Sequence, residues 1–226
     1  MSRVSCTLLV VAKAPVPGLA KTRLAATVGA EAAASLAAAA LLDTLDAVLA
    51  VDVAARVVAL TGDLGLAHRG DELRRVLARF HVVPQRGTGL GERLVAAHAD
   101  SATVVGGPVL QIGMDTPQVG ARLLLESART LADPAVDGVF GPATDGGWWA
   151  LGLSDPTRAS FLHGIPMSQP DTGARTLDGL RRSVGTVQEL AELTDVDTVD
   201  DLWPVADLQP PDRRFRREVE ASRPAR

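Results

Sequence analysis

The sequence predicts an α/β fold with a mostly parallel sheet that helices cover on both faces. Short apolar runs with β-branched residues alternate along the chain with longer segments of helical composition. Leu8–Ala12 is the first strand, Ala30–Leu49 is a long Ala- and Leu-rich helix, and Arg56–Thr61 is the second strand. Such alternation is typical of strands joined through crossover helices, which makes neighbouring strands parallel.

The same alternation continues to the end of the chain. The Pro-broken stretch Phe161–Thr172 is expected to be a loop. Asp212–Arg226, with six arginines and three acids, is expected to be a frayed helix or a disordered tail. The other predicted elements are helices over Asp71–Arg79 and Gly173–Arg182, a helix starting at about Val199, and strands over His81–Pro84, Val109–Gly113, Gly138–Gly141, Trp148–Leu153 and Val184–Val187.

Length and composition limit the class of protein. A chain of 226 residues that is 46% hydrophobic can build a full core, and we expect one domain over residues 1–208 with an Arg-rich helix or tail over 209–226. The net charge of −4 and the pI of about 5.6 argue against nucleic acid as a partner. Cys6 is the only cysteine, so no internal disulfide forms and core packing is its expected role. We see no membrane span and no signal peptide, and expect a cytoplasmic protein.

The first strand leads into a loop that is rich in positive charge. Lys13 opens the loop, Lys21 and Arg23 follow it at the start of a helix, and no Asp or Glu occurs between Leu8 and Gly29. A helix start after a strand offers free backbone N–H groups and partial positive charge to an anion. The P-loop pattern is absent, because Ala20 stands where that motif needs a glycine before its lysine. The alternatives are a phosphate site and an ordinary basic surface loop.

A second candidate loop follows the third strand. Gln85 is followed by glycines at every second position, which is not the spacing of the dinucleotide fingerprint. The glycines would let a planar ligand approach closely, and the amide of Gln85 offers the paired donor and acceptor that reading a nucleotide base requires. The other interpretation is a loop that merely leads into a helix. The glycines are Gly87, Gly89 and Gly91.

Carboxylates follow the later strands. Asp115 comes after the buried strand Val109–Gly113 and before Pro117, which is expected to open a helix. Asp115 is therefore either a ligand at the edge of the sheet or an ordinary helix cap. Asp145 lies in the Gly-rich turn Ala143–Gly147 between two strands, where an Asp-Gly hairpin without a ligand is the alternative. Asp195 and Asp197 precede a helix that Thr198 would cap.

Four segments together resemble a known family. They are KAPVPGLAKTRL (13–24), GMDTP (113–117), GPATDGGWWALGL (141–153) and TDVDTVDDL (194–202). The chain resembles the cofC-like, GT-A-type bacterial proteins classed with glycosyltransferases, which belong to the nucleotide-diphospho-sugar transferase superfamily. These are relatives of the nucleotidyltransferases that act in molybdopterin and coenzyme F420 synthesis. The resemblance implies a three-layer α/β/α sandwich that is related to the Rossmann fold and has a mixed, mostly parallel sheet.

The resemblance also implies roles for particular residues. Asp115 and Asp197 would hold one Mg²⁺ or Mn²⁺ on the nucleotide phosphates, with Asp195 as the alternative to Asp197. The residues implied in catalysis are Lys21, Asp115 and Asp145. Those implied in nucleotide binding are Ala12, Lys13, Ala14, Pro17, Gly18, Lys21, Arg23, Gln85, Gly89, Gly91, Met114 and Asp115. Those implied in acceptor binding are Thr144, Asp145, Gly146, Gly147 and Trp148, and we expect Trp148 and Trp149 to face opposite sides of the sheet.

The function that these roles imply is metal-dependent transfer of a sugar from a nucleotide-diphosphate sugar to a small-molecule acceptor. A nucleotidyltransferase that joins an NTP to a small phosphorylated metabolite and releases pyrophosphate is the alternative enzyme. A non-catalytic nucleotide sensor is a third class, which metal-dependent turnover would exclude. The sequence leaves a homodimer open and does not name the base, the sugar or the acceptor.

Overall fold

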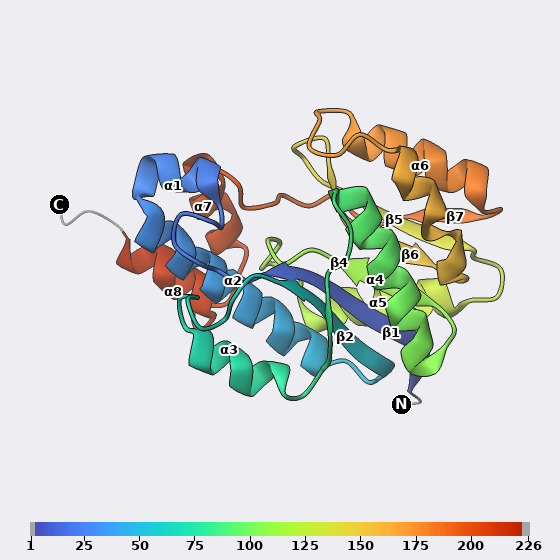
Figure 1. The fold of residues 1–226 in the computed structure, drawn as a ribbon, viewed down its shortest axis with the longest axis horizontal. Helices are drawn as coiled ribbons and strands as arrows, with labels where there is room; N and C mark the ends of the chain where they lie inside the picture. Colours follow the sequence, from blue (N-terminus) through green and yellow to red (C-terminus); the bar gives the residue numbers. More distant parts are fainter. Residues whose placement is uncertain (1–2, 223–226) are drawn as a thin grey trace.

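A single sheet with seven strands forms the centre of the computed structural model, which describes residues 3–222 (Figure 1). The strand order is β3-β2-β1-β4-β6-β5-β7. Strand β6 runs antiparallel to both of its neighbours, while the other pairs are parallel, so the sheet is mixed and mostly parallel as expected. The strands are β1 (Val4–Lys13), β2 (Val53–Thr61), β3 (His81–Pro84), β4 (Val109–Ile112), β5 (Gly138–Pro142), β6 (Trp148–Leu153) and β7 (Val187–Glu189).

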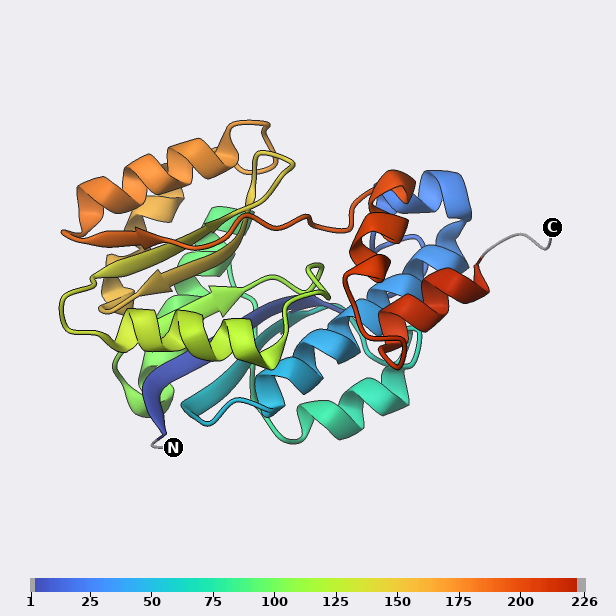
Figure 2. The same ribbon diagram turned by 180° about the vertical axis from the view of Figure 1, so that it is seen from behind.

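Helices cover both faces of the sheet, which completes the three layers. Helices α2 (Ala30–Leu49), α3 (Gly70–Leu77) and α5 (Ala121–Ala132) pack on one face, and Figure 2 views this side. Helices α4 (Leu90–Val105) and α6 (Thr172–Ser183) and the 3₁₀ segment η1 (Pro156–Gly164) pack on the other. Strand β1 shows why: Leu8 and Val10 point into the α2 and α5 side, whereas Leu9 between them packs with α4.

A group of helices lies beyond the ends of the strands, at one end of the molecule. Helices α1 (Thr22–Val28), α7 (Val199–Asp207) and α8 (Arg214–Ala221) pack around the first half of α2, and both views show them together at one end of the molecule. We call this group the helical lobe. Leu24, Leu36 and Phe215 are buried in its core. An extended segment, residues 190–198, runs from β7 to α7 and joins the lobe to the sheet.

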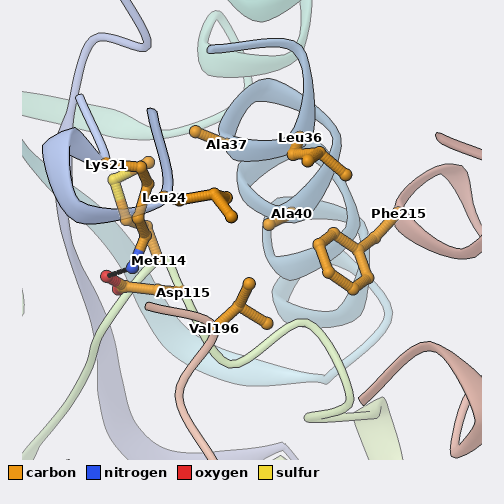
Figure 3. A pocket seen from close by; sticks show the side chains of 9 residues that line it. All are labelled: Lys21, Leu24, Leu36, Ala37, Ala40, Met114, Asp115, Val196 and Phe215. Atoms are coloured by element: carbon orange, nitrogen blue, oxygen red, sulfur yellow. Dashed lines mark hydrogen bonds and ion pairs between the residues drawn. The ribbon is translucent and has the colours of Figure 1, made fainter. Parts of the chain in front are cut away.

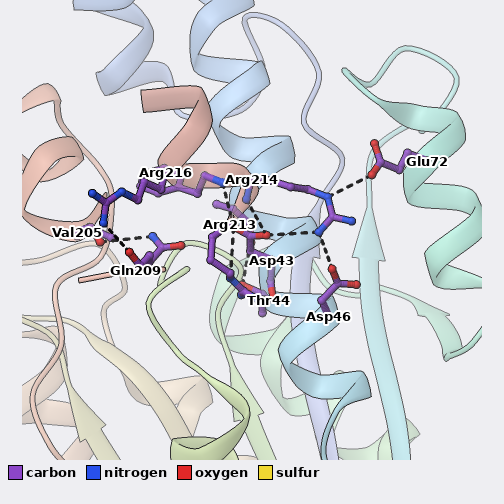
Figure 4. Close-up of polar contacts among 11 residues, drawn as sticks. Asp43, Thr44, Asp46, Glu72, Val205, Gln209, Arg213, Arg214 and Arg216 are labelled. Carbon is purple, nitrogen blue, oxygen red and sulfur yellow. Dashed lines mark hydrogen bonds and ion pairs between the residues drawn. The ribbon is translucent and has the colours of Figure 1, made fainter. Parts of the chain in front are cut away.

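The Arg-rich C-terminal segment forms a helix within the described residues, as one of the two expectations had it, but the helix is packed and not frayed, and the alternative of a disordered tail is wrong there. Asp43, a fully buried residue in the middle of α2, accepts the N–H of Phe215 at 2.9 Å and thereby caps α8 from a different helix. Arg214 reaches Asp46 at 2.5 Å and Glu72 at 3.2 Å (Figure 4). Arg213, Arg214 and Arg216 thus have partners inside the fold. Residues 223–226 of the expected tail lie outside the described residues.

Three other expectations require correction. The strand expected over Val184–Val187 begins only at Val187, because Val184 is the C-cap of α6. The helix after Asp115 begins at Ala121, with Gly120 as its N-cap, so Pro117 does not open it. The segment Phe161–Thr172 is not wholly a loop, since η1 extends to Gly164.

Helix α2 is the one described helix that is long and apolar enough to cross a membrane, with a mean hydropathy of 1.6. Its most apolar window is 83% buried inside the fold, which is the burial of a core helix. Cys6 is buried in β1, and burial raises the pKa of its thiol to about 12, in keeping with the expected packing role.

Candidate functional site

The candidate residues lie at the edge of the sheet where the parallel strands end. Strands β1 and β4 are parallel neighbours, and β5 runs in the same direction, because each of β4 and β5 is antiparallel to β6. The loop before α1, the Asp115 segment and the turn before Trp148 therefore leave the sheet at one edge, as expected of an α/β ligand site. The extended segment that carries Asp195 and Asp197 crosses the same edge, where Leu193 bridges to Ala143.

Lys21 joins two carboxylates that are far apart in the sequence. Its Nζ atom lies 2.6 Å from Oδ2 of Asp115 and 3.6 Å from Oδ1 of Asp197. Arg23 approaches Asp197 from the solvent side and donates to Oδ2 at 2.8 Å. The structure thus brings Asp115 and Asp197 together around one ammonium group, with a second cation on the outer carboxylate.

The backbone holds Lys21 in a conformation that is unusual for a lysine. Lys21 is the N-cap of α1 with φ of 49° and ψ of 50°, in the left-handed region that strains a residue with a side chain. Its side chain is only 11% exposed. Burial lowers the pKa of the ammonium. The carboxylates of Asp115, then Asp197 and Asp195, raise it by more than burial lowers it, so the net pKa lies above its usual value. Lys21 therefore stays protonated at neutral pH.

A small cavity lies against this ion pair (Figure 3). It has a volume of about 10 Å³, which is room for about one water molecule. Most of its walls are apolar and belong to the helical lobe, so it separates the ion pair from the lobe core. The lining residues are Lys21, Leu24, Leu36, Ala37, Ala40, Met114, Asp115, Val196 and Phe215.

Asp195 is a third carboxylate at this edge. Its Oδ1 atom is buried and has no hydrogen-bond partner among the described residues. Burial raises the pKa of Asp195 to about 7, the Asp115 carboxylate adds to the rise, and the Lys21 ammonium opposes it. Asp145 and Asp197 also raise this pKa, so three carboxylates act on Asp195.

The first loop lies beside the Asp115 segment. The N–H of Lys13 donates to Sδ of Met114 at 3.1 Å, and the N–H of Ala14 donates to Thr61 O at 2.8 Å. The side chain of Lys13 turns back to donate to the carbonyl of Leu19. Gly18 has φ of 75° and is exposed, so the turn that begins at Pro17 has solvent on its outer side. The ammonium of Lys13 is therefore hydrogen-bonded within the loop.

Gln85 has a structural contact that the sequence did not reveal. Its Nε2 group reaches across β2 and donates to the carbonyl of Ala12 at 2.8 Å and to that of Ala59 at 3.0 Å. Both amide hydrogens are therefore used by the backbone, and only the amide oxygen remains for a base. Gly91 is buried, and an added Cβ would lie 2.5 Å from the carbonyl of Leu162, so it permits close packing of α4 on η1. Gly89, in contrast, is exposed and open.

The turn before β6 has a fixed shape. Asp145 accepts the N–H of Gly147 at 2.8 Å through Oδ1. Gly146 has φ of 84°, and a Cβ there would lie 1.9 Å from the carbonyl of Pro170, so only glycine fits. Thr144 and Trp148 complete the expected acceptor residues. Thr144 is exposed and bonds to the Thr194 hydroxyl at 3.2 Å.

The two tryptophans face opposite sides of the sheet, as predicted. Trp148 is half-buried and packs with the cluster under η1 and α6. Trp149 is 1% exposed on the other face, and its ring N–H donates to the carbonyl of Ala191 at 2.9 Å. Trp148 directly follows the turn of Asp145 in the chain.

Sequence comparison identifies the family. Residues 44–169 match the family described as "Uncharacterized protein conserved in bacteria (DUF2064)". The chain belongs to the DUF2064 family. No curated protein matches the sequence. The matched range of this DUF2064 protein contains Gln85, Asp115, Asp145 and Trp148, while Lys21 and Asp197 lie outside it.

Two solved structures similar to the DUF2064 protein carry descriptions of enzymes that use nucleotides. A protein from Desulfovibrio desulfuricans G20, provisionally assigned as a nucleotide-diphospho-sugar transferase, is 25% identical with a TM-score of 0.80 over 96% of each chain. A 4-diphosphocytidyl-2C-methyl-D-erythritol synthase from Anaerococcus prevotii is 12% identical with a TM-score of 0.58, over 92% of this chain and 97% of that one. The fold is thus the one expected from the resemblance, that of nucleotide-diphospho-sugar transferases and nucleotidyltransferases.

A third similar structure contains a metal. A protein from Mycobacterium tuberculosis H37Rv, solved in complex with manganese, is 20% identical with a TM-score of 0.52, over 89% of this chain and 97% of that one. In the DUF2064 protein, no group of three or more His, Cys, Asp or Glu residues within 3–222 forms a metal cage. The carboxylate pair and the unpartnered Oδ1 of Asp195 nevertheless fit a hard divalent cation that completes its shell with phosphate oxygens.

Proposed function

We propose that this DUF2064 protein is a metal-dependent glycosyltransferase that takes a nucleotide-diphosphate sugar as donor. The observation that carries the proposal is the meeting of Asp115, Asp197 and Lys21 at the strand-end edge, beside a loop without acids. Two carboxylates and phosphate oxygens suit Mg²⁺ or Mn²⁺, and Lys21 and Arg23 suit the diphosphate. The likeness to a nucleotide-diphospho-sugar transferase over 96% of the chain supports the same class.

The residues of the chain divide between donor and acceptor. Asp115 and Asp197 would hold the metal, whose positive charge offsets the negative charge that develops on the leaving diphosphate. Lys21 and Arg23 would bind phosphate oxygens. Asp145, fixed by its bond to Gly147, would accept the proton of the acceptor hydroxyl while that oxygen bonds to the anomeric carbon and the bond to the diphosphate breaks.

The charge at the acceptor side favours sugar transfer to a neutral hydroxyl. Asp145 would stand there with Asp195, whose pKa is raised by burial first, then by Asp115 and, to a smaller extent, by Asp145. A phosphorylated acid, which the nucleotidyltransferase alternative requires, would be repelled by these carboxylates. The Anaerococcus prevotii structure keeps nucleotidyl transfer as the second candidate.

The test is a panel of nucleotide-diphosphate sugars, and separately of NTPs with sugar phosphates, with Mn²⁺, Mg²⁺ or a chelator. We expect metal-dependent release of a nucleoside diphosphate from one donor. Pyrophosphate release from an NTP would instead identify a nucleotidyltransferase. Asp115→Asn should abolish turnover, while Asp207→Asn, a change on the exposed side of α7, should not. Nucleotide binding without any turnover would identify the non-catalytic sensor.

A further inference from the structure

The ammonium of Lys21 lies where a metal held by Asp115 and Asp197 would have to bind. Its Nζ atom is 2.6 Å from one carboxylate and 3.6 Å from the other. A divalent cation between the same oxygens would need contacts of about 2.0–2.6 Å. The two cations would overlap, and their like charges would repel each other. Lys21 and the metal therefore exclude each other at this carboxylate pair.

We propose that Lys21 is a tethered cation that holds the metal position of the Asp115–Asp197 pair until the phosphates of a nucleotide draw it away. The inference rests on the proposed function and goes beyond it, because it makes the binding of metal and of nucleotide mutually dependent. The phosphates of the nucleotide would bind the ammonium of Lys21, which would then leave the carboxylates of Asp115 and Asp197. A metal ion could then bind between these carboxylates and the phosphates. By linkage, each ligand raises the affinity for the other by the same factor.

The surroundings of Lys21 suit this exchange. The left-handed backbone at φ of 49° fixes the point from which the side chain leaves the chain. The aliphatic part lies beside Leu24 and Met114 at the wall of the small cavity, so the position is built rather than a chance surface contact (Figure 3). Lysine has a flexible stem and rotatable donors, so the ammonium can move from the carboxylates to nearby phosphate oxygens without moving the backbone.

Arg23 provides the matched comparison. It also pairs with Asp197, but its side chain is 70% exposed and it reaches only the outer oxygen, Oδ2. Removing Arg23 leaves the ammonium of Lys21 between the carboxylates. A variant of Arg23 therefore reports the effect of losing a positive charge near the site, whereas a variant of Lys21 also reports the effect of losing the tethered cation.

The experiment measures Mn²⁺ binding, without nucleotide, by electron paramagnetic resonance and calorimetry. Lys21→Met should bind Mn²⁺ about tenfold or more tightly than the unaltered chain, because no ammonium has to be displaced. Arg23→Met should change the affinity by less than about threefold. Adding Asp115→Asn to Lys21→Met should remove the gain, which places the ion at this carboxylate pair. Lys21→Gln serves as the second variant if Lys21→Met does not fold.

Mn²⁺ affinity that is equal in the unaltered chain and in both Lys21 variants would overturn the inference. A second arm titrates GDP, UDP, CDP and ADP with and without Mn²⁺. In the unaltered chain Mn²⁺ should tighten binding of one diphosphate, and in Lys21→Met this coupling should be smaller, because only the direct contacts of the metal with the phosphates remain. If no nucleotide binds the unaltered chain with Mn²⁺, the proposed function fails. If one binds and the coupling in Lys21→Met is as large as in the unaltered chain, only the inference fails.

Discussion

The backbone N–H of Val196 donates to the carbonyl of Asp115 at a distance of 2.9 Å. This bond joins two segments that are distant in sequence, and it lies next to both carboxylates of the candidate metal site. A second bond, from Nε2 of Gln118 to the carbonyl of Thr194 at 2.7 Å, joins the same two segments. The spacing of Asp115 and Asp197 is thus set also by these two hydrogen bonds to the main chain, and not only by the ion pairs of Lys21.

Asp201 should position Asp197 without contacting a ligand. Its Oδ2 atom accepts the N–H of Asp197 at 3.0 Å and that of Thr198 at 2.7 Å. We expect Asp201→Ala to lower the free energy of unfolding by about 0.5–2 kcal/mol, as loss of a helix cap does, and to weaken Mn²⁺ binding. Urea unfolding and calorimetry measure the two effects. Asp200→Ala, an exposed neighbour, should change stability by less than about 0.5 kcal/mol. Equal Mn²⁺ affinity in the Asp201 and Asp200 variants would contradict the positioning role.

Asp195 should make stability depend on pH. Its pKa is raised from the usual 3.8 to about 7, so between these values the folded carboxyl keeps its proton while the unfolded one ionises. The unfolded state then binds fewer protons, and stability should fall as pH rises through this window and level off above it, by at most about 4 kcal/mol. Asp195→Asn should lack this fall when unfolding is measured in a chelator. Identical pH profiles for the two proteins would rule out a raised pKa in the fold.

Gln85 should contribute to stability through its two backbone contacts. Gln85→Ala leaves the carbonyls of Ala12 and Ala59 without their side-chain donor, which should cost about 1–3 kcal/mol of unfolding free energy. Urea denaturation checks this, with the exposed Gln188→Ala as the matched control, for which we expect less than about 0.5 kcal/mol. A change in purine and pyrimidine discrimination without loss of stability would instead restore the base-reading role.

Phe215 should anchor the C-terminal helix. It is fully buried in the helical lobe and lines the cavity beside Lys21. We expect Phe215→Ala to lower the free energy of unfolding by about 3–5 kcal/mol, as other deletions of buried aromatic rings do. Arg217→Ala, two positions further along the exposed side of α8, should cost less than about 0.5 kcal/mol. Equal midpoints of urea unfolding would show that α8 is not part of the cooperative fold.

Much of the fold could be predicted because local signals agreed with the tertiary structure. The helix Ala30–Leu49, which its Ala- and Leu-rich composition predicted, and the strand His81–Pro84 have the predicted bounds. The prediction that the last strand begins at Val184 was wrong. The β-branched side chain of Val184 suits a strand, but the pairing of β7 with β5 begins at Val187. The predicted start of α5 at Pro117 was also wrong. The N–H of Val119 donates to the carbonyl of Thr116, and this turn around Pro117 precedes the helix.

The candidate site was predictable where it depends on topology and not where it depends on side-chain partners. Strand direction alone brings Asp115 and the turn of Asp145 to one edge. No spacing in the sequence shows that Lys21 would bind between two carboxylates or that the amide of Gln85 would bind the backbone. The role of Asp43 had a signal that was not used, because a lone acid within the apolar run AAAALLDTL implies a buried partner.

The extended segment that joins β7 to the helical lobe has a consequence for how the protein is made. Five of the sheet's strands, and Lys21 and Asp115 with them, are complete in the chain before residue 150, but Asp197 leaves the ribosome much later. During synthesis the ammonium of Lys21 has at first only one of its two carboxylates. The site is therefore assembled last, when the final quarter of the chain crosses the finished edge and its backbone bonds to Asp115.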